Sequence, residues 1–426
     1  MIFLDFIVEA RMPNFKFIDL FAGIGGFHQA MSALGGICVF ACDINEDCRR
    51  VYKKNFCSNN EFSIEDDINK FTDKNSIQSF DVLCGGFPCQ TFSKAGNRTG
   101  FSKRDARGQL FYRIIDILEN HPECKYVFLE NVRNLADNEK NWNVVCTELK
   151  KQGFIITETP IIESPENFGI PQTRERVYIL GMKKKITNLE QITRENLNID
   201  NLHNPFNGNC IDWIIDDNID NKYLLKQDLV NLLDYWEEFL QELRRTNTIK
   251  SPFWLFHAGL HQSRNKWEID KDIYNENLPS WKKHLLLKTR KMYEANKKFI
   301  DNWDQIHNMS KRFLIHQKFE WNASRDCTSI QQGIIQIRQS GVRVKSPNVF
   351  PSLVAMKNIP IIWDNNINHY RQLTVKECAK LQSFKKDYIF DENDEISYKQ
   401  LGNSVNVEVI RLIARQLFLL GGMINE

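Results

Sequence analysis

The first half of the chain contains short apolar runs that end in glycine or acidic residues. Five such runs lie between residues 15 and 182. Runs of this length that are rich in Val, Ile and Phe are typical of buried β-strands. We therefore predict strands at Lys16–Phe21, Ile37–Ala41, Phe80–Cys84, Tyr126–Leu129 and Arg176–Gly181.

Longer segments with a helical pattern separate these strands. They span Gly26–Leu34, Glu46–Asn55, Gly108–Asn120 and Asn143–Gln152. Strands that alternate with helices form βαβ units and a parallel sheet. The pattern predicts an α/β fold with a doubly wound, Rossmann-like sheet.

The pattern changes after Lys185. Residues 187–222 are rich in Asn, Asp and Ile, and residues 223–321 carry six tryptophans among many basic residues. A helix-like apolar run returns at Tyr398–Leu420. We predict a first domain over 1–186 that the C-terminal segment 397–426 completes, and a second, less regular domain over 187–396.

Charge and cysteine content exclude only a few classes of protein. The chain has 426 residues, and 56 Lys and Arg nearly balance 54 Asp and Glu, for a net charge of +2. A nucleic-acid surface would therefore need local segregation of charge. The 11 cysteines include no C-x-x-C pair, which argues against a zinc cluster or a disulfide framework and favours a reducing compartment.

The apolar residues do not predict a membrane or secretion signal. The run Ile2–Val8 lacks a basic start and a cleavage site, so it does not resemble a signal peptide. No apolar stretch is long enough to span a bilayer. We expect a cytoplasmic protein without a metal site, which starts at Met1 or at Met12.

The first predicted strand runs into a glycine turn. Glycines such as Gly23 and Gly25 let a backbone approach a ligand closely. Asp43 follows the second strand at about the offset of a ribose-binding acid, roughly 20 residues on. The third glycine of the dinucleotide pattern is replaced by His28. This disfavours a nicotinamide dinucleotide and leaves two alternatives, another adenosine cofactor or a purely structural turn.

The third predicted strand leads directly to Cys89 through two glycines and Pro88. A cysteine at the carboxyl end of such a strand lies where α/β enzymes place ligands, and its thiolate would be a nucleophile. Most cysteines are instead small buried hydrophobes. Taken alone, the local sequence favours a structural cysteine here.

Two further motifs place charged side chains at strand ends. Glu130 follows a strand, where it could donate a proton or cap a helix. Arg174 and Arg176 stand at alternate positions and would project to one side. They suit an oxyanion or a phosphate, or else a surface ion pair with Glu175.

In this order and spacing, the motifs resemble those of the cytosine carbon-5 DNA methyltransferases. The resemblance covers most of residues 15–186 and 338–412. It implies a methyltransferase sheet of the kind that uses S-adenosylmethionine, together with a smaller target-recognition domain. The matching segments are FIDLFAGIGGF, GGFPCQTFS, ENV, QTRERVYILG, RQLTVKECAKLQSF from Arg371 and YKQLGNSVNVEV from Tyr398.

The resemblance implies how S-adenosylmethionine would be held. Phe21 would lie against the adenine, Asp43 would bind the ribose hydroxyls, and Asp67 would accept from the adenine amino group. Ile44 would contact the ring, and Ser404 would bring the last helix near the cofactor. The implied cofactor-binding residues are Phe21, Gly23, Gly25, Asp43, Ile44, Asp67, Asn403 and Ser404.

The implied catalytic residues are Cys89, Glu130, Arg174 and Arg176. Cys89 would add to carbon 6 of a cytosine that is flipped out of the duplex. Glu130 would protonate ring nitrogen 3, and Arg176, with Arg174 beside it, would hold the base oxygen. The basic segment Lys94–Gln109 is either a loop that closes over the base or a solvated loop.

The expected substrate is double-stranded DNA, held in a cleft between the domains of a monomer. In the second domain, Lys282–His284 and Lys288–Lys291 could meet phosphates. Equally, the stretch around Lys291–Trp303 could be an ordinary amphipathic helix with a solvated face. Gly341–Lys345 could add a base or backbone contact. We expect most of the tryptophans to lie in the core.

The expected setting is restriction–modification, with a cognate restriction endonuclease as the functional partner. Two rival functions remain, a tRNA cytosine methyltransferase with the same fold and an inactive DNA-binding relative. The long middle region favours DNA, because reading a sequence needs additional surface. The intact Cys89, Glu130 and Arg176 favour an active enzyme.

Overall fold

The chain folds into two compact units. The first unit takes Met1–Asn207, Pro351–Lys357 and Val375–Glu426, and the second takes Gly208–Phe350 and Asn358–Thr374. The computed structural model describes residues 15–57, 63–71, 76–88, 109–216, 219–246, 251–255, 277–313, 316–355 and 358–425.

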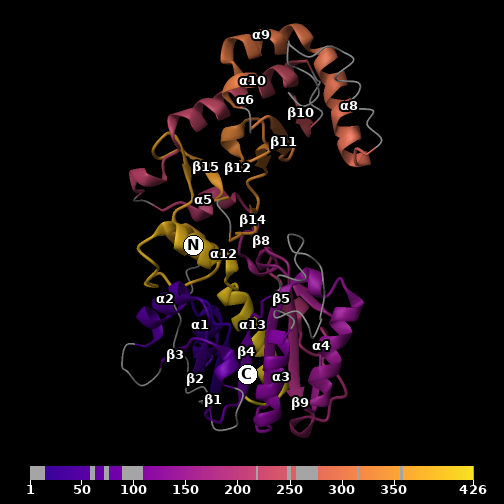
Figure 1. The fold of residues 1–426 in the computed structure, drawn as a ribbon, viewed down its shortest axis with the longest axis vertical. Helices are drawn as coiled ribbons and strands as arrows, with labels where there is room; N and C mark the ends of the chain where they lie inside the picture. Colours follow the sequence, from indigo (N-terminus) through magenta and orange to yellow (C-terminus); the bar gives the residue numbers. More distant parts are fainter. Residues whose placement is uncertain are drawn as a thin grey trace. The chain divides into compact units, whose positions relative to one another are not determined.

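A central sheet organises the first unit. Within the described residues it has eight strands in the order β3-β2-β1-β4-β5-β9-β6, with β7 also paired to β9. Figure 1 shows β2 and β3 on one side of β1 and β5 and β9 on the other. The strands are β1 (Phe15–Leu20), β2 (Gly36–Cys42), β3 (Ile64–Glu65), β4 (Val82–Gly85), β5 (Tyr126–Val132), β6 (Phe154–Ile156), β7 (Ile161–Glu163) and β9 (Arg176–Lys183).

Helices bury these strands. Val127 and Leu129 of β5 are fully buried in one apolar cluster with Ile114 and Val145 from the helices that flank β5 in the sequence. The helices of this unit are α1 (Gly26–Ser32), α2 (Glu46–Phe56), α3 (Gln109–Asn120), α4 (Glu139–Lys151), α11 (Val375–Leu381), α12 (Asp394–Asn403) and α13 (Val407–Leu420). Short 3-10 turns are η1 (Ile68–Lys70), η2 (Arg133–Leu135), η3 (Pro165–Phe168), η4 (Lys184–Ile186) and η5 (Ile199–Leu202).

The five predicted strands are all present, but the sheet is not wholly parallel. Strands β1 to β5 are parallel, whereas β9 runs antiparallel to both β5 and β6. Strand β6, which follows α4, therefore runs parallel to β5, and β9 lies between these two strands. The apolar run of β9 revealed its burial but not its direction.

The C-terminal helix packs on the first unit, as the sequence predicted. Phe418 of α13 contacts Phe15 and Tyr126 edge-on, at 5.0 and 5.3 Å between ring centroids. The Tyr126 hydroxyl donates to the Gly421 carbonyl at 3.0 Å. These contacts join the two ends of the described chain to the middle of the sheet.

The first unit takes more of the chain than the expected 1–186 and 397–426. It extends to Asn207 and resumes at Val375, with Pro351–Lys357 between. Residues 187–207 belong to it because η5 packs against α13, and residues 375–396 because α11 packs against α12.

The second unit is built on its own sheet, in the order β10-β11-β13-β12-β15-β16. Its strands are β10 (Phe253–Trp254), β11 (Lys318–Asn322), β12 (Ile334–Arg338), β13 (Gly341–Lys345), β15 (Ile361–Asp364) and β16 (His369–Gln372). Its helices are α5 (Cys210–Ile214), α6 (Gln227–Arg245), α8 (Ser280–Ala295), α9 (Lys297–His307) and α10 (Met309–Arg312), with η6 (Asn221–Tyr223) and η8 (Ile330–Gln332). Two short strands, β8 (Gln172–Thr173) and β14 (Phe350–Pro351), complete the described elements.

Aromatic side chains fill the core of the second unit. Trp236 and Trp303 are 0% and 1% exposed, and their rings lie 5.6 Å apart. Phe253 and Phe319 stack beside them. These two tryptophans are core residues, as predicted, whereas Trp281 is 64% exposed.

Candidate active site

The turn after β1 is shaped by three residues with positive φ. Phe21, Gly23 and Gly25 have φ of 56°, 55° and 82°. A Cβ on Gly25 would lie 2.3 Å from the Phe56 ring, whereas a Cβ on Gly23 would have no atom of the described residues within 4 Å. Gly25 is therefore needed for packing, and Gly23 borders open space where a ligand could approach.

Asp43 fastens this turn from the end of β2. Its Oδ2 accepts from the Gly23 amide at 2.7 Å, and its Oδ1 accepts from the Asn45 amide at 2.8 Å. Burial raises the pKa of Asp43, against the lowering effect of these hydrogen bonds. The next residue, Ile44, is 74% exposed. An open glycine turn, a half-buried acid and an exposed apolar side chain fit an adenosine group.

Asp67 lies at the end of β3, which pairs with β2 in parallel. Its Oδ1 accepts from the Asn69 backbone amide at 3.0 Å and caps η1. The Asp43 amide donates to the Glu65 carbonyl at 3.0 Å, which links the two strand ends. Asp43 and Asp67 therefore follow adjacent carboxyl ends of one parallel sheet.

The segment after β4 runs beside the end of β5. Asn131 is 2% exposed, and its Nδ2 donates to the Phe87 carbonyl at 3.1 Å. A Cβ on Gly86 would lie 3.6 Å from Glu130 Oε2. Cys89 follows this segment in the sequence, but it and residues 94–108 of the expected closing loop Lys94–Gln109 lie outside the described residues.

Glu130 and Arg176 form an ion pair at this edge of the sheet. Arg176 Nε lies 2.9 Å from Glu130 Oε1, and the two side chains are 17% and 11% exposed. Burial raises the pKa of Glu130, and the neighbouring Arg176 and Arg174 oppose that rise. A carboxyl group with a raised pKa is suited to donate a proton near neutral pH.

The Arg174 side chain is hydrogen-bonded to two other segments of the first unit. Its guanidinium donates to the Ser352 hydroxyl and to the carbonyls of Leu353, Gly402 and Ser404. Burial lowers the pKa of Arg174 to about 9, which leaves it a cation at neutral pH. Arg174 lies near enough to Glu130 to oppose the rise of its pKa. Three of the hydrogen bonds of Arg174 nevertheless go to backbone carbonyls, and the fourth goes to the Ser352 hydroxyl.

Glu175, between the two arginines, does not pair with either of them. Its Oε1 lies 2.7 Å from Arg133 Nη1, while Arg176 Nη1 donates to the Glu175 carbonyl. The expected alternative of a surface ion pair among Arg174, Glu175 and Arg176 is therefore not formed.

The segment after α12 approaches the glycine turn. A Cβ on Gly26 would lie 3.1 Å from the Ser404 hydroxyl and 2.7 Å from Val405 Cγ2. Val405 also lies near Gly86, at 4.0 Å from the position of a Cβ there. Asn403, the last residue of α12, is exposed.

The sequence motifs contained two residues whose positions could not be anticipated. Asn131 of the ENV motif ties β5 to the segment before Cys89, and Val405 of the GNSV motif lies against both Gly26 and Gly86. Only their place in the matching segments signalled them.

In the second unit, one buried acid gathers three cations. Glu320 of β11 is 6% exposed and lies within 2.7 Å of Lys318 Nζ, 3.1 Å of Arg338 Nη2 and 2.5 Å of Arg343 Nε. We call these four residues the Glu320 cluster. Of the residues alternating with them, Phe319, Val342 and Ile335 face the apolar core.

The basic runs that could meet phosphates, Lys282–His284 and Lys288–Lys291, lie on α8. Leu285, Leu286 and Thr289 of this helix are buried, Lys288 Nζ donates to the Ser251 carbonyl at 2.7 Å, and Arg290 pairs with Glu294. Lys288 and Arg290 thus bind other residues of the second unit, as charged residues of an ordinary amphipathic helix do.

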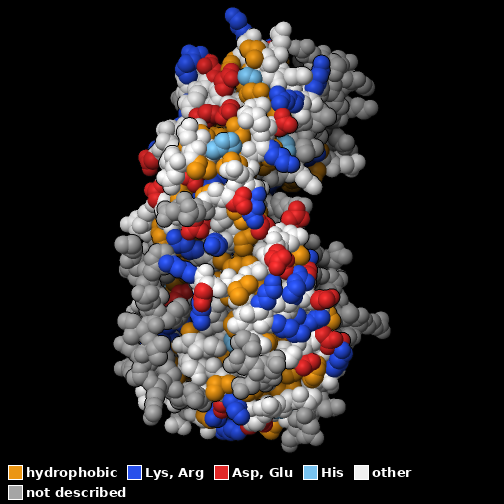
Figure 2. Space-filling view, turned by 90° about the vertical axis from the view of Figure 1, so that its left-hand side faces the viewer, with side chains coloured by type: hydrophobic (Ala, Val, Ile, Leu, Met, Phe, Trp, Pro, Cys, Tyr) orange, Lys and Arg blue, Asp and Glu red, His pale blue; other side chains and the backbone are white. Residues whose placement is uncertain are grey.

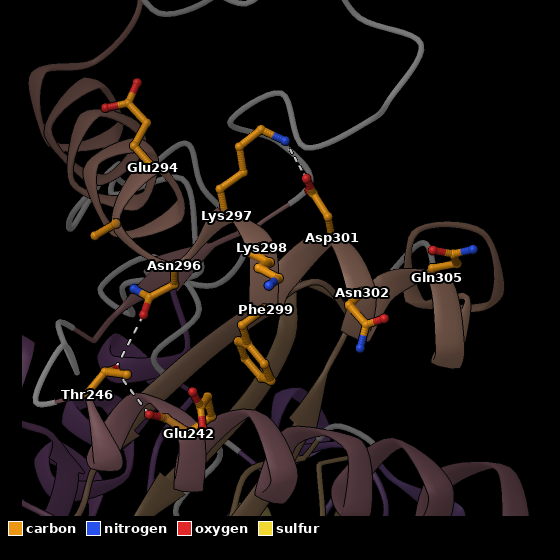
Figure 3. A pocket seen from close by; sticks show the side chains of 11 residues that line it. Glu242, Thr246, Glu294, Asn296, Lys297, Lys298, Phe299, Asp301, Asn302 and Gln305 are labelled. Carbon is orange, nitrogen blue, oxygen red and sulfur yellow. Dashed lines mark hydrogen bonds and ion pairs between the residues drawn. The ribbon is translucent and has the colours of Figure 1, made fainter.

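A hollow of about 910 Å³ lies among α6, α8 and α9 (Figure 3). Three acidic and two basic side chains are among the residues that line it, and Lys297 pairs with Asp301. None of the predicted site residues lines it. Its lining residues are Glu242, Thr246, Glu294, Ala295, Asn296, Lys297, Lys298, Phe299, Asp301, Asn302 and Gln305.

Neither a metal site nor a membrane-spanning helix is found among the described residues. No group of three or more His, Cys, Asp and Glu there could hold a metal ion. No described helix has the length and apolarity needed to cross a membrane.

Comparison with known proteins places the whole arrangement in one family. The model of the C-5 cytosine-specific DNA methylases matches residues 15–419. Type II methyltransferase M.AluI of Cellulosimicrobium cellulans is 28% identical over 95% of this chain and 92% of its own length. Type II methyltransferase M.HgiCI of Herpetosiphon aurantiacus is 30% identical over 95% and 97%. The solved S. pombe Dnmt2 methyltransferase shares the fold, with a TM-score of 0.53 and 16% identity over 95% of this chain and 98% of its own.

Proposed function

The chain belongs to the C-5 cytosine-specific DNA methylase family, and on this premise we propose that it methylates carbon 5 of one cytosine within a specific sequence of double-stranded DNA. S-adenosylmethionine, when bound, supplies the methyl group. The observation that carries the proposal is the pairing of buried Glu130 with Arg176 beside the segment that leads to Cys89.

Residues that follow the strand ends of the first unit would hold the cofactor. Asp43, Gly23 and Ile44 would hold the cofactor's adenosine, since they form an open turn with an acid and an apolar side chain. Phe21, Gly25 and Asp67 would shape the same site, and Ser404 with Asn403 would close it.

Cys89 would add to carbon 6 of the flipped cytosine as Glu130 protonates nitrogen 3. This breaks the aromaticity of the ring and makes carbon 5 nucleophilic. Arg176 would hold the base oxygen as charge develops there. Loss of the carbon-5 proton and elimination of the Cys89 thiolate would restore the ring.

The second unit would read the target sequence. Charge on the face in Figure 2 is interspersed rather than of one sign, so binding needs a local surplus. The Glu320 cluster offers one, since three cations surround one carboxylate. The polar strand faces of Lys318, Arg338 and Arg343 are thus suited to phosphates or base edges.

The proposed setting is restriction–modification with a cognate endonuclease, because the relatives that match along their whole length are type II methyltransferases. Bisulfite sequencing of a plasmid that expresses the chain tests the function. We expect one cytosine of a short sequence to be protected throughout, and no protection with Cys89→Ser. Methylation of tRNA with unprotected plasmid DNA would favour the RNA rival instead.

A further inference from the structure

Arg174 holds together two segments that are remote from it in the sequence. Nη1 donates to Ser352 Oγ at 3.1 Å and to the Leu353 carbonyl at 2.9 Å. Nη2 donates to the carbonyls of Gly402 at 3.0 Å and Ser404 at 2.6 Å. The side chain is only 3% exposed. Its planar fork therefore donates to four protein acceptors from a buried position.

The two segments also pack tightly on each other. A Cβ on Gly402 would lie 2.4 Å from the Val354 carbonyl carbon and 2.6 Å from the Ala355 nitrogen. The backbone chains thus approach as closely as glycine allows. With this contact and the guanidinium bridge, the position of residues 402–404 is fixed from two sides.

Residues 404–405 border both the cofactor turn and the segment beside Glu130. Ser404 and Val405 lie against Gly26 of the cofactor turn, and Val405 also lies near Gly86 on the side of Glu130. Arg174 itself stands two residues before Arg176, which contacts Glu130. A shift of Arg174 would therefore move the wall of the cofactor turn relative to the base-binding pair.

We propose that Arg174 is a positioning residue that clamps Gly402–Val405 against the cofactor turn, and that it does not itself touch the base. The inference rests on the proposed function of Arg176 and Glu130. All four Nη donors already have protein acceptors, and the fifth donor, the Nε–H, has no hydrogen-bond partner but is buried among the described residues. Lysine could not replace the planar fork.

The test compares Arg174→Lys with Arg176→Lys. Calorimetry with S-adenosylhomocysteine gives the cofactor-site Kd, and rapid quenching with 5-fluorocytosine DNA gives the rate of adduct formation at saturating cofactor. For Arg174→Lys we expect a Kd about tenfold higher and a smaller loss of rate, because a clamp acts first on cofactor binding. For Arg176→Lys we expect the reverse.

Arg371→Lys is the matched control. Arg371 is also a fully buried arginine, paired to Asp364 at 2.6 Å within the second unit. Its replacement should lower the unfolding temperature without changing the cofactor-site Kd. Ser352→Ala, which removes one acceptor of the clamp, is the milder variant if Arg174→Lys does not fold. It should raise the Kd about twofold to threefold.

An unchanged Kd in Arg174→Lys, or in Ser352→Ala where that variant is needed, would overturn the clamp. If the wild-type chain bound no S-adenosylhomocysteine, the proposed function would fail rather than the role of Arg174.

Discussion

Arg176 and Glu130 meet diagonally across the antiparallel pair of β9 and β5, with Nε 2.9 Å from Oε1. Neither residue is directly opposite the other, since Arg176 pairs with Val132 and Glu130 with Tyr178. The antiparallel insertion of β9 thus creates the pair. In a wholly parallel sheet, the start of β9 would lie at the opposite edge from the end of β5.

The ion pair predicts the effect of a change that keeps the charge. Arg176→Lys should slow adduct formation with 5-fluorocytosine DNA about 10-fold to 100-fold, because the lysine loses the planar fork that holds Glu130 and the base. Arg133→Lys is the control, since Arg133 also pairs with a glutamate but is 46% exposed. It should change the rate by less than about twofold. Equal losses in both variants would contradict a role for the pair.

The raised pKa of Glu130 predicts the shape of the pH profile. Adduct formation needs a protonated Glu130 and a Cys89 thiolate, so its rate should be flat between their two pKa values and fall below that of Glu130. Glu130→Gln cannot titrate. Its slower rate should rise about tenfold per pH unit up to the pKa of Cys89.

Single-turnover quenching across pH measures both curves. The lower limb of the wild-type profile should lie above the ordinary glutamate pKa, because burial disfavours the carboxylate. Parallel profiles for the wild type and Glu130→Gln would show that Glu130 is not the acid.

The two glycines of the cofactor turn should respond differently to alanine. Gly25→Ala forces a Cβ against Phe56 at a positive φ and should destabilise the fold by about 2–4 kcal/mol. The Cβ of Gly23→Ala meets no atom of the described residues within 4 Å, so its cost to stability should be the backbone strain of about 1 kcal/mol.

Cofactor binding separates the same two variants. Gly23→Ala should weaken the binding of S-adenosylhomocysteine about tenfold or more, since the added methyl group fills the open side of the turn. Chemical denaturation and calorimetry give the two quantities. An unchanged Kd in Gly23→Ala would move the cofactor away from this turn.

The Glu320 cluster predicts the salt dependence of DNA binding. If these side chains bind phosphates as proposed, Lys318→Ala and Arg338→Ala should each lower the slope of log K against log salt by about one, because each would remove one phosphate contact. Arg312→Ala is the control, since Arg312 pairs with Asp228 outside the cluster. Fluorescence anisotropy with a duplex at several salt concentrations measures the slopes. If Lys318→Ala and Arg338→Ala had the same slope as Arg312→Ala, the DNA would bind elsewhere on the second unit.

Much of the first unit followed from the sequence, because its strands are short continuous apolar runs. The start of α4 was missed by four residues, since Asn138 caps the helix at a polar stretch without apolar periodicity. The direction of β9 was missed because apolar runs look alike in either direction. The acceptors of Arg174 were missed because 352–353 and 402–404 approach it only through tertiary packing.

The second unit was less predictable for a physical reason. Its core is a cluster of aromatic side chains from helices and strands, and aromatic residues spaced along the chain do not specify either period. No sequence motif singled out Glu320. Only the parallel pairing of β11 with β13, which sets Glu320 opposite Arg343, buries it among cations.

The most direct test of the account is the covalent intermediate on Cys89. The full-length chain is incubated with S-adenosylmethionine and a duplex that carries 5-fluorocytosine in the sequence found by bisulfite mapping, and peptide mass spectrometry locates the linkage. The account predicts one adduct per chain, on Cys89, and none with Cys89→Ser, which should still bind S-adenosylhomocysteine. An adduct on another cysteine, or methylation of duplex DNA that persists in Cys89→Ser, would contradict it.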